Sequence, residues 1–309
     1  INPDCPERLK ELENFSYETI NIETVAKKAF AKRYLVGVKY CFKARKVFKA
    51  QQDFDVMMVQ SCPWAPFAIA FAKSCVKTPV IYNSQDMFPG ASIANGAMKQ
   101  KWMQKVFYMF QKVAYRRADH ISVISEDMKQ KVIEQGVPAA KITVIPDWYD
   151  DKSVREIPWE DNLFVKKYDL KKDCFYVQFA GTMGMNFDYK MVLRVAEKLK
   201  QDKKIVFQMI GQGSQKDEFI HAAQEKKLDN IVFLPLEPQE MVPHVYSACS
   251  ACLIPLPRGV IGNSVPSKAG LLMACHRVIV TSADEGSDYN DMFKREQIGM
   301  AFDCDDSDG

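Results

Sequence analysis

Short apolar runs alternate with amphipathic segments along the first half of the chain, and this pattern predicts a parallel sheet covered by helices. The runs predicted as strands are rich in β-branched residues and cover residues 55–60, 78–83, 120–125 and 141–146. Segments with helical periodicity separate them. Strands that are repeatedly separated by helices are typical of a doubly wound parallel sheet.

A second alternation of strands and helices follows a polar, irregular stretch that begins near residue 150. It predicts strands over residues 175–180, 205–210, 231–234, 251–255, 278–281 and 299–302. A chain of 309 residues also has room for about two domains with separate cores. We therefore expect an α/β fold of two Rossmann-like, doubly wound parallel-sheet domains. Their expected bounds are 1–150 and 173–309, with a linker over 151–172.

Two predicted helices, 25–50 and 98–118, combine basic charge with an apolar face. The first contains no acidic residue, and the second places an apolar set on one face: Trp102, Val106, Met109, Phe110 and Val113. Such helices bind anionic membrane surfaces, but a buried apolar stripe beneath a solvated charged face gives the same pattern. We favour the membrane surface for 25–50 and leave both interpretations open for 98–118. No nucleic acid partner is expected, because the net charge is only +3 and no nucleic-acid-binding module is present.

Composition places the chain among soluble globular proteins, with 47% hydrophobic and 26% charged residues. Its nine cysteines are scattered through apolar runs, which indicates reduced thiols and a cytoplasmic location. Cys249 and Cys252 have metal-site spacing but lead into an apolar strand, so we expect packing rather than a metal site. No run of about 18 apolar residues predicts a transmembrane helix. The chain starts at Ile1 and stops just after a strand-like run, which indicates a piece that lacks both ends.

Two glycine corners follow the first two strands of the second half. They contain Gly181 with Gly184, and Gly211 with Gly213. Ligands bind at the carboxyl ends of strands in open parallel sheets, and glycine lets them approach the backbone closely. Plain tight turns use glycine in the same way, so each corner alone is a weak signal. Lys216 stands where a dinucleotide fingerprint needs a third glycine, so a nicotinamide-binding domain is not favoured.

A helix start at Ser267 and Lys268 completes a third corner at the same edge of the sheet. Ser267 follows Pro266 and is the predicted N-cap of a short helix. A lysine in the first turn opposes the helix dipole, unless a bound anion shares the helix N-terminus with it. The segment therefore predicts a phosphate site, and the alternative is an ordinary helix with a surface lysine.

Six short motifs occur in an order and spacing that resemble the family-4 retaining glycosyltransferases of GT-B fold. The similarity is greatest to the branch that builds colanic-acid, capsular and O-antigen polysaccharides. It covers nearly the whole chain, and weak motifs in series are much more specific than any one of them. The motifs span residues 83–89, 117–126, 144–150, 180–184, 210–213 and 266–274.

The resemblance implies two domains facing a cleft, with a UDP- or GDP-sugar donor in the C-terminal domain and the acceptor in the N-terminal one. Ser267 and Lys268 would hold the donor phosphates and neutralise the departing nucleotide, and Asp86 would contact sugar or acceptor hydroxyls. The other donor-binding candidates are Gly181, Thr182, Gly184, Gly211, Gly213 and Asn263. The resemblance also implies no metal, no cofactor, and a lipid-linked saccharide acceptor at the inner face of the plasma membrane.

Two departures from the family pattern keep other functions open. The family commonly carries two glutamates, and here the matching positions hold Asn263 and Leu271. Leu271 cannot accept the hydrogen bond of a nucleotide ribose. The alternatives are therefore a catalytically inactive relative that serves as a binding subunit, and a nucleotide-sugar epimerase of the same fold. His276 replaces the glycine that usually ends this helix, and we expect it in a left-handed cap.

Overall fold

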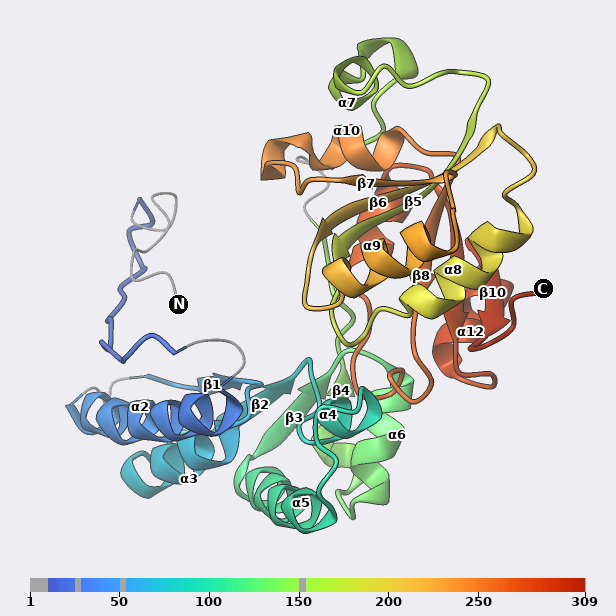
Figure 1. Ribbon diagram of the computed structural model, residues 1–309. Coiled ribbons are helices and arrows are strands. Elements are labelled where there is room, and N and C mark those ends of the chain that lie inside the picture. The colour runs from blue at the N-terminus through green and yellow to red at the C-terminus, as the bar shows by residue number, and fades with distance from the viewer. Residues whose placement is uncertain (1–10, 26–28, 51–53, 150–153, 309) are drawn as a thin grey trace. The chain divides into compact units, whose positions relative to one another are not determined.

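Helices alternate with strands in the described chain from residue 30 onward, as Figure 1 shows. The computed structural model describes residues 11–25, 29–50, 54–149 and 154–308. The chain divides into two compact units, one made of residues 1–84 with 106–122 and the other of 85–105 with 123–309. Among the described residues, no helix is both long enough and apolar enough to cross a membrane.

A four-stranded sheet, ordered β1-β2-β3-β4, occupies the first half of the chain. Its strands are β1 Met57–Gln60, β2 Val80–Ser84, β3 His120–Val123 and β4 Ile142–Val144. The helices are α2 Phe30–Ala50, α3 Ala65–Cys75, α4 Gly90–Ala94, α5 Lys101–Arg117 and α6 Glu126–Glu134. The predicted strands and helices are confirmed with shifted ends, and residues 26–28 of the predicted helix 25–50 lie outside the described chain.

The buried side of α5 is not the one that its sequence predicts. Its buried residues share one stripe at helical spacing: Phe107, Gln111, Ala114 and Tyr115. Gln111 donates a hydrogen bond of 2.8 Å from its Nε2 to the Tyr115 hydroxyl, whereas its Oε1 is buried without a hydrogen-bond partner among the described residues. Trp102, Met109 and Val113 are exposed instead. Val106 and Phe110 of the predicted face are half-buried, and Phe110 packs against the Phe67 ring. The predicted apolar face of this helix is therefore buried only in part.

A six-stranded sheet, ordered β10-β9-β8-β5-β6-β7, occupies the second half of the chain. The strands are β5 Phe175–Thr182, β6 Ile205–Gln212, β7 Ile231–Leu234, β8 Ala251–Pro255, β9 Val278–Ala283 and β10 Gly299–Asp303. Neighbouring strands are parallel, and all six predicted strands are confirmed. The predicted fold class, two parallel-sheet α/β domains, therefore holds. The predicted linker 151–172, of which 151–153 lie outside the described chain, falls between the two sheets in sequence, and the domain bounds stay a prediction.

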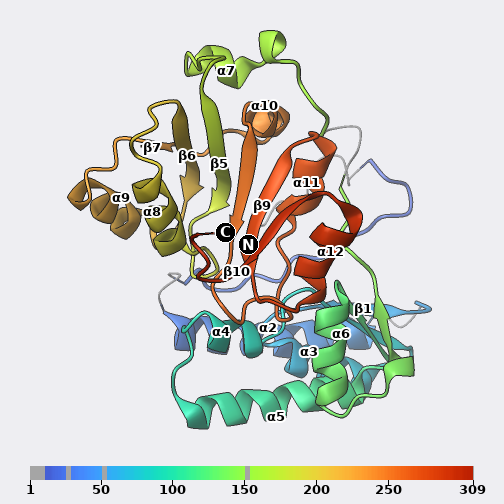
Figure 2. The same cartoon turned by 90° about the vertical axis from the view of Figure 1, so that its right-hand side faces the viewer.

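Helices cover both faces of the six-stranded sheet, as Figure 2 shows. They are α7 Leu163–Lys167, α8 Tyr189–Lys198, α9 Lys216–Glu225, α10 Val242–Ser247, α11 Lys268–Ala274 and α12 Asp288–Glu296. Strand side chains alternate between the two faces. Phe179 and Phe207 belong to the core shared with α8 and α9, whereas Tyr176 and Ile210 belong to the core shared with α10, α11 and α12. Burial on both faces explains why these strands are nearly continuous apolar runs.

The strand order reverses between β5 and β8, which are neighbours in the sheet although they are far apart in sequence. One half of the sheet continues from β5 through β6 to β7, and the other from β8 through β9 to β10. Loops that leave two such strands turn to opposite faces, and the crevice between them is the usual ligand site of an open parallel sheet. The candidate site is therefore expected at the carboxyl ends of β5 and β8.

The distribution of side chains between core and surface is that of a globular protein. Cys249 and Cys252 are buried with their sulfur atoms 3.1 Å apart, and their hydrogen bond and burial raise the pKa of the Cys252 thiol. The pair therefore packs in the core, as predicted.

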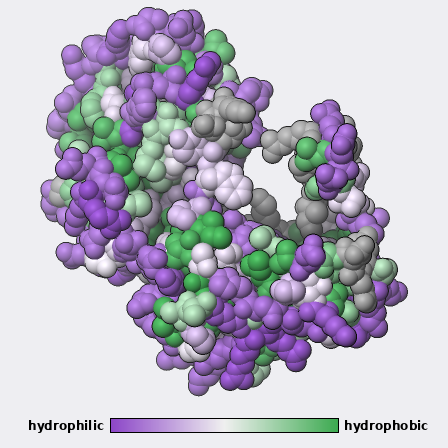
Figure 3. Space-filling view, turned by 180° about the vertical axis from the view of Figure 1, so that it is seen from behind, coloured by the Kyte–Doolittle hydropathy of each residue, from purple (hydrophilic) through white to green (hydrophobic). Residues whose placement is uncertain are grey.

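Within the described residues, no three His, Cys, Asp or Glu side chains are placed to hold a metal ion. On the face seen in Figure 3, hydrophilic residues cover most of the surface and hydrophobic ones gather in small groups.

Candidate functional site

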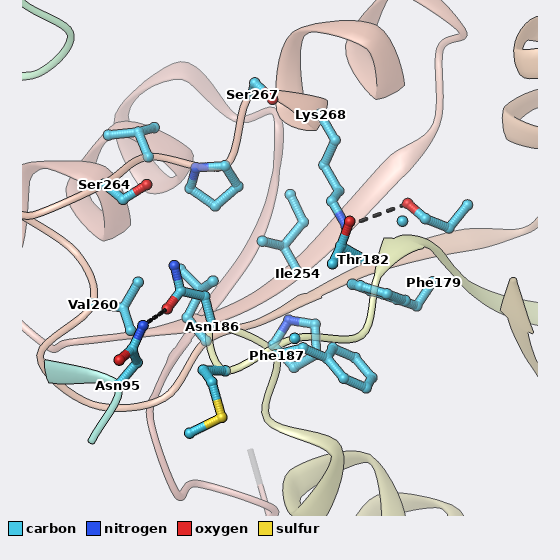
Figure 4. Close-up of a pocket in the computed structure, with 18 of the residues that line it drawn as sticks. Asn95, Phe179, Thr182, Asn186, Phe187, Ile254, Val260, Ser264, Ser267 and Lys268 are labelled. Carbon is cyan, nitrogen blue, oxygen red and sulfur yellow. Dashed lines mark hydrogen bonds between the residues drawn. The ribbon is translucent and has the colours of Figure 1, made fainter. Parts of the chain in front are cut away.

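A cavity of about 590 Å³ opens at the carboxyl ends of β5 and β8, where the strand order reverses. Figure 4 shows the side chains of its walls. Most of them are apolar, and the hydrogen-bonding ones come from several segments: Asn95, Thr182, Asn186, Tyr246, Ser264, Ser267 and Lys268. Of the described residues that line it, none is a carboxylate and only Lys268 is a cation. A cavity of this size with a few convergent polar groups is typical of a small-ligand site.

The loop that follows β5 forms one wall of the cavity through Gly181 and Gly184. Gly181 and Gly211 face each other in the β5–β6 ladder, and both have positive φ, +153° and +138°. A Cβ atom on Gly211 would lie 1.9 Å from the carbonyl oxygen of Gly181, and one on Gly213 would lie 2.1 Å from that of Met183. Gly211 and Gly213 thus support the loop through close backbone contact and do not themselves line the cavity.

Lys268 reaches the same loop from the start of α11. Its Nζ donates a hydrogen bond of 3.3 Å to the carbonyl oxygen of Ala180 and lies 3.7 Å from the centroid of the Phe179 ring. Burial of the ammonium group lowers its pKa to about 8. Among the described residues, this desolvated cation has a long carbonyl contact and an aromatic face and is short of compensating negative charge. An anion bound in the cavity would supply that charge.

Ser267 occupies the position before α11, as predicted, but its side chain does not cap the helix. Its backbone is already helical, with φ −60° and ψ −19°, whereas a capping serine is extended. Ser125 shows the contrast at α6, where its hydroxyl accepts a hydrogen bond of 3.2 Å from the Met128 N–H. The Ser267 hydroxyl is therefore left at the cavity wall beside Lys268. After α11, His276 has φ +52°, which confirms the predicted left-handed cap.

Asn263 and Leu271, the two departures from the family pattern, have different surroundings. Asn263 is buried, and its Nδ2 donates a hydrogen bond of 2.9 Å to the Gly259 carbonyl. The backbone carbonyl of Asn263 accepts a hydrogen bond of 2.8 Å from the Met87 N–H, and the Asn263 side chain fills the space beside Gly90. The Asn263 side chain thus does not line the cavity, although sequence reasoning made it a donor-binding candidate. Leu271 does line it and presents an apolar surface there.

Asp86 is exposed and reaches the cavity through Ser264. Its Oδ1 accepts a hydrogen bond of 2.6 Å from the Ser264 hydroxyl, and Ser264 lines the cavity. The Asp86 carboxylate also lies near Asp147, whose pKa is raised by partial burial and by this neighbouring negative charge. The structure therefore connects Asp86 to the cavity through Ser264, whereas Gly181, Thr182, Gly184, Ser267 and Lys268 line the cavity themselves.

Sequence reasoning missed the two asparagines of the cavity wall. Asn186 follows the glycine corner at Gly184 directly along the chain, and this proximity was a usable signal. Asn95 gave no signal, because it ends the short helix α4 in a distant part of the sequence. Its Nδ2 donates a hydrogen bond of 3.0 Å to the Asn186 Oδ1, drawn as a dashed line in Figure 4.

Most of the chain matches known glycosyltransferases in sequence. Residues 17–148 match the family described as "Glycosyl transferase 4-like domain", and residues 161–308 match "Glycosyl transferases group 1". The Escherichia coli (strain K12) protein named "Putative colanic acid biosynthesis glycosyl transferase WcaI" is 26% identical over 176 residues, 57% of this chain and 43% of that protein. The "Probable glycosyltransferase WbjE" of Pseudomonas aeruginosa is 25% identical over 224 residues, 71% of this chain and 54% of that protein. The chain thus spans about half the length of these relatives.

The fold is also similar to that of a solved structure, Anabaena Alr3699/HepE in complex with UDP-glucose. The TM-score is 0.68 at 14% sequence identity, and the match covers 87% of this chain and 69% of HepE. At this level of identity the likeness concerns the fold alone. It agrees with two parallel-sheet domains, each with helices on its sheet.

Proposed function

This chain belongs to the family-4 glycosyltransferases of GT-B fold, and we propose that it transfers a sugar from a nucleotide-sugar donor to a saccharide acceptor in polysaccharide biosynthesis. The observation that carries the proposal is the cavity at the strand reversal, where the half-buried Lys268 meets a glycine corner. The names of WcaI and WbjE support glycosyl transfer. The UDP-glucose bound to HepE supports a UDP-sugar donor, and a GDP-sugar is the alternative.

In the proposed reaction the donor diphosphate lies between the loop after β5 and the start of α11. Gly181 and Gly184 let phosphate oxygens approach backbone N–H groups, and the hydroxyls of Thr182 and Ser267 add further donors. Lys268 neutralises the charge that grows on the leaving nucleotide as the glycosidic bond breaks. A fixed cation in a poorly hydrated cavity is most effective there, because it needs no reorganisation during the reaction. We propose that these groups act without a metal ion.

We further propose that the anomeric configuration is retained. No carboxylate belongs to the cavity wall in the described chain, and in the proposed reaction a leaving phosphate oxygen takes the proton of the acceptor hydroxyl. An acceptor that gives its proton to the leaving phosphate attacks from the face that the phosphate leaves. Asp86, hydrogen-bonded to Ser264 beside the cavity, would orient the acceptor by accepting hydrogen bonds from its hydroxyls.

The proposed acceptor is a lipid-linked saccharide at the inner face of the plasma membrane, approached through α2 and α5. The exposed Trp102 and Met109 of α5 lie on the same helix as the exposed Lys101 and Lys105. The helix α2 similarly exposes Phe42 among its lysines. Apolar and basic side chains together on a helix surface favour an anionic lipid surface.

A binding subunit without catalysis is the second candidate function. Leu271 favours it, because this residue turns an apolar surface to the cavity where the family commonly has a ribose-binding carboxylate. Such a protein would bind nucleotides and release no product. Binding alone therefore does not separate the two candidates, and transfer to an acceptor does.

Nucleotide binding is the first test of the proposal. UDP, GDP or their sugars should raise the melting temperature of the protein, because a ligand that binds only the native state stabilises it. Lys268→Ala should lose this shift at the same ligand concentrations. Lys190→Ala, an exposed lysine on α8, is the matched control and should keep it. A full shift in Lys268→Ala, or no shift with any nucleotide in the wild-type protein, would contradict the proposal.

A further inference from the structure

The hydrogen bonds of Asn95 fix which atoms Asn186 offers to a ligand. The backbone N–H of Ala97 donates a hydrogen bond of 3.1 Å to the Asn95 Oδ1, so the Asn95 oxygen faces Ala97. The Asn95 Nδ2 then donates to the Asn186 Oδ1 at 3.0 Å. An amide carries its oxygen on one side and its nitrogen on the other. Asn186 must therefore turn its Nδ2 away from Asn95.

The Nδ2 of Asn186 is left for a ligand. In the described part of the chain it has no hydrogen-bond acceptor, and Asn186 lines the cavity. Figure 4 shows this nitrogen pointing away from Asn95. Its two N–H groups can only donate, so their partners must be oxygen or other acceptor atoms. This end of the cavity is therefore suited to an oxygen-rich part of a ligand.

The asparagine pair and Lys268 lie on opposite sides of the cavity in the view of Figure 4. If the diphosphate lies at Lys268, a neighbouring part of the donor extends to Asn186. Ser264 lies on the asparagine side of the same view, and its hydroxyl is bonded to Asp86, the residue proposed to orient the acceptor. The acceptor must reach the anomeric carbon of the sugar. The part of the donor at this end is therefore the sugar rather than the nucleoside.

We propose that Asn186, positioned by Asn95, selects the sugar of the donor by donating hydrogen bonds to its hydroxyl oxygens. The inference rests on the proposed function, because it takes a nucleotide sugar as the ligand. The surroundings of the two departures from the family pattern agree with it. Asn263 is buried beside Gly90, and Leu271 is apolar. Neutral N–H donors thus recognise the sugar in a wall that has no carboxylate among its described residues.

Titration calorimetry with UDP and UDP-glucose separates the sugar contact from the nucleotide contact. Asn186→Ala should weaken UDP-glucose binding about five- to tenfold, as expected for the loss of one or two hydrogen bonds, and leave UDP binding within about twofold. Asn186→Leu keeps the size of the side chain and should have the same effect. GDP and GDP-mannose take the place of this pair if the wild-type protein binds GDP.

The positioning role of Asn95 has its own readout. Asn95→Ala should weaken UDP-glucose binding in the wild-type background and have almost no further effect once Asn186 is alanine, because it acts through that side chain. Additive effects of the two substitutions would overturn this role. The melting temperature of each unliganded variant shows whether it is folded.

Two failures can be told apart in this experiment. If folded Asn186→Ala and Asn186→Leu lose UDP and UDP-glucose affinity equally, or lose neither, the assignment of Asn186 to the sugar is overturned while the proposed function stands. If the wild-type protein binds neither UDP nor GDP nor their sugars, the proposed function is overturned and the inference with it.

Discussion

Lys268 is the residue on which the proposed chemistry depends, and its charge varies with pH. Its pKa is lowered by burial from the ordinary 10.5 to about 8. Between these values the folded protein binds fewer protons than the unfolded chain, so this group's contribution to the free energy of unfolding rises with pH. Below pH 8 the lysine is charged in both states, and its burial is a cost. A bound phosphate offsets that cost, because it stabilises the ammonium form.

Nucleotide affinity should therefore fall as the pH rises above 8. We expect the dissociation constant for UDP to increase about tenfold between pH 7 and pH 9, because the free lysine, with its pKa of about 8, loses its proton there. Lys268→Arg stays charged over this range, and its UDP affinity should change little. Titration calorimetry at the two pH values measures both. An unchanged wild-type affinity, or an equal fall in Lys268→Arg, would contradict a protonated Lys268 as the phosphate partner.

Only some residues of the candidate site could be predicted one at a time. Gly181 and Lys268 stand at the ends of regular elements, where the sequence shows both the element and the unusual residue. Asn95 could not be found in this way, because its role depends on a hydrogen bond to Asn186, far away in sequence. Asn263 was a candidate by position only, and its burial beside Gly90 depends on packing that the sequence does not reveal.

At the scale of elements, the strands were predictable and the orientation of a helix was not. Strands buried on both faces are continuous apolar runs, so β5 to β10 are visible in the sequence. In α5 two stripes compete for burial. The stripe with Gln111 is the buried one, with the glutamine Nε2 bonded to the Tyr115 hydroxyl, and Trp102 stays outside. A polar residue that is buried through one specific hydrogen bond cannot be recognised from the apolar pattern alone.

The exposed face of α5 makes its association with membranes testable. Co-sedimentation should show more protein bound to vesicles that contain phosphatidylglycerol than to phosphatidylcholine vesicles. Replacing Lys101 and Lys105 by glutamine should weaken binding about fivefold per charge, since each basic residue near an anionic surface contributes about 1 kcal/mol. Trp102→Ser should weaken it further, and Lys190→Gln on α8 should not. Equal binding to both kinds of vesicle, or no effect of the α5 substitutions, would contradict the proposed surface.

At the scale of the whole molecule, the alternation of strands and helices was sufficient to predict two parallel-sheet domains. It also predicts a ligand site at the carboxyl ends of the strands, whereas the reversal of strand order between β5 and β8 is known only from the folded sheet. What the pattern could not supply is the set of segments that meet at the cavity. Asn95, Asn186, Ser264 and Lys268 come from four loops or helix ends, and only the folded chain brings them to one cavity.

Sugar transfer by this protein is measured most directly by following the donor and the acceptor together. Purified protein is incubated with the nucleotide sugar that binds best and with a lipid-diphosphate-linked saccharide, and both products are identified by mass spectrometry. We expect nucleotide release that requires the acceptor, an acceptor longer by one sugar, and a loss of at least about a hundredfold in kcat for Lys268→Ala. Nucleotide binding without transfer to any acceptor, or an epimerised nucleotide sugar formed without an acceptor, would contradict it.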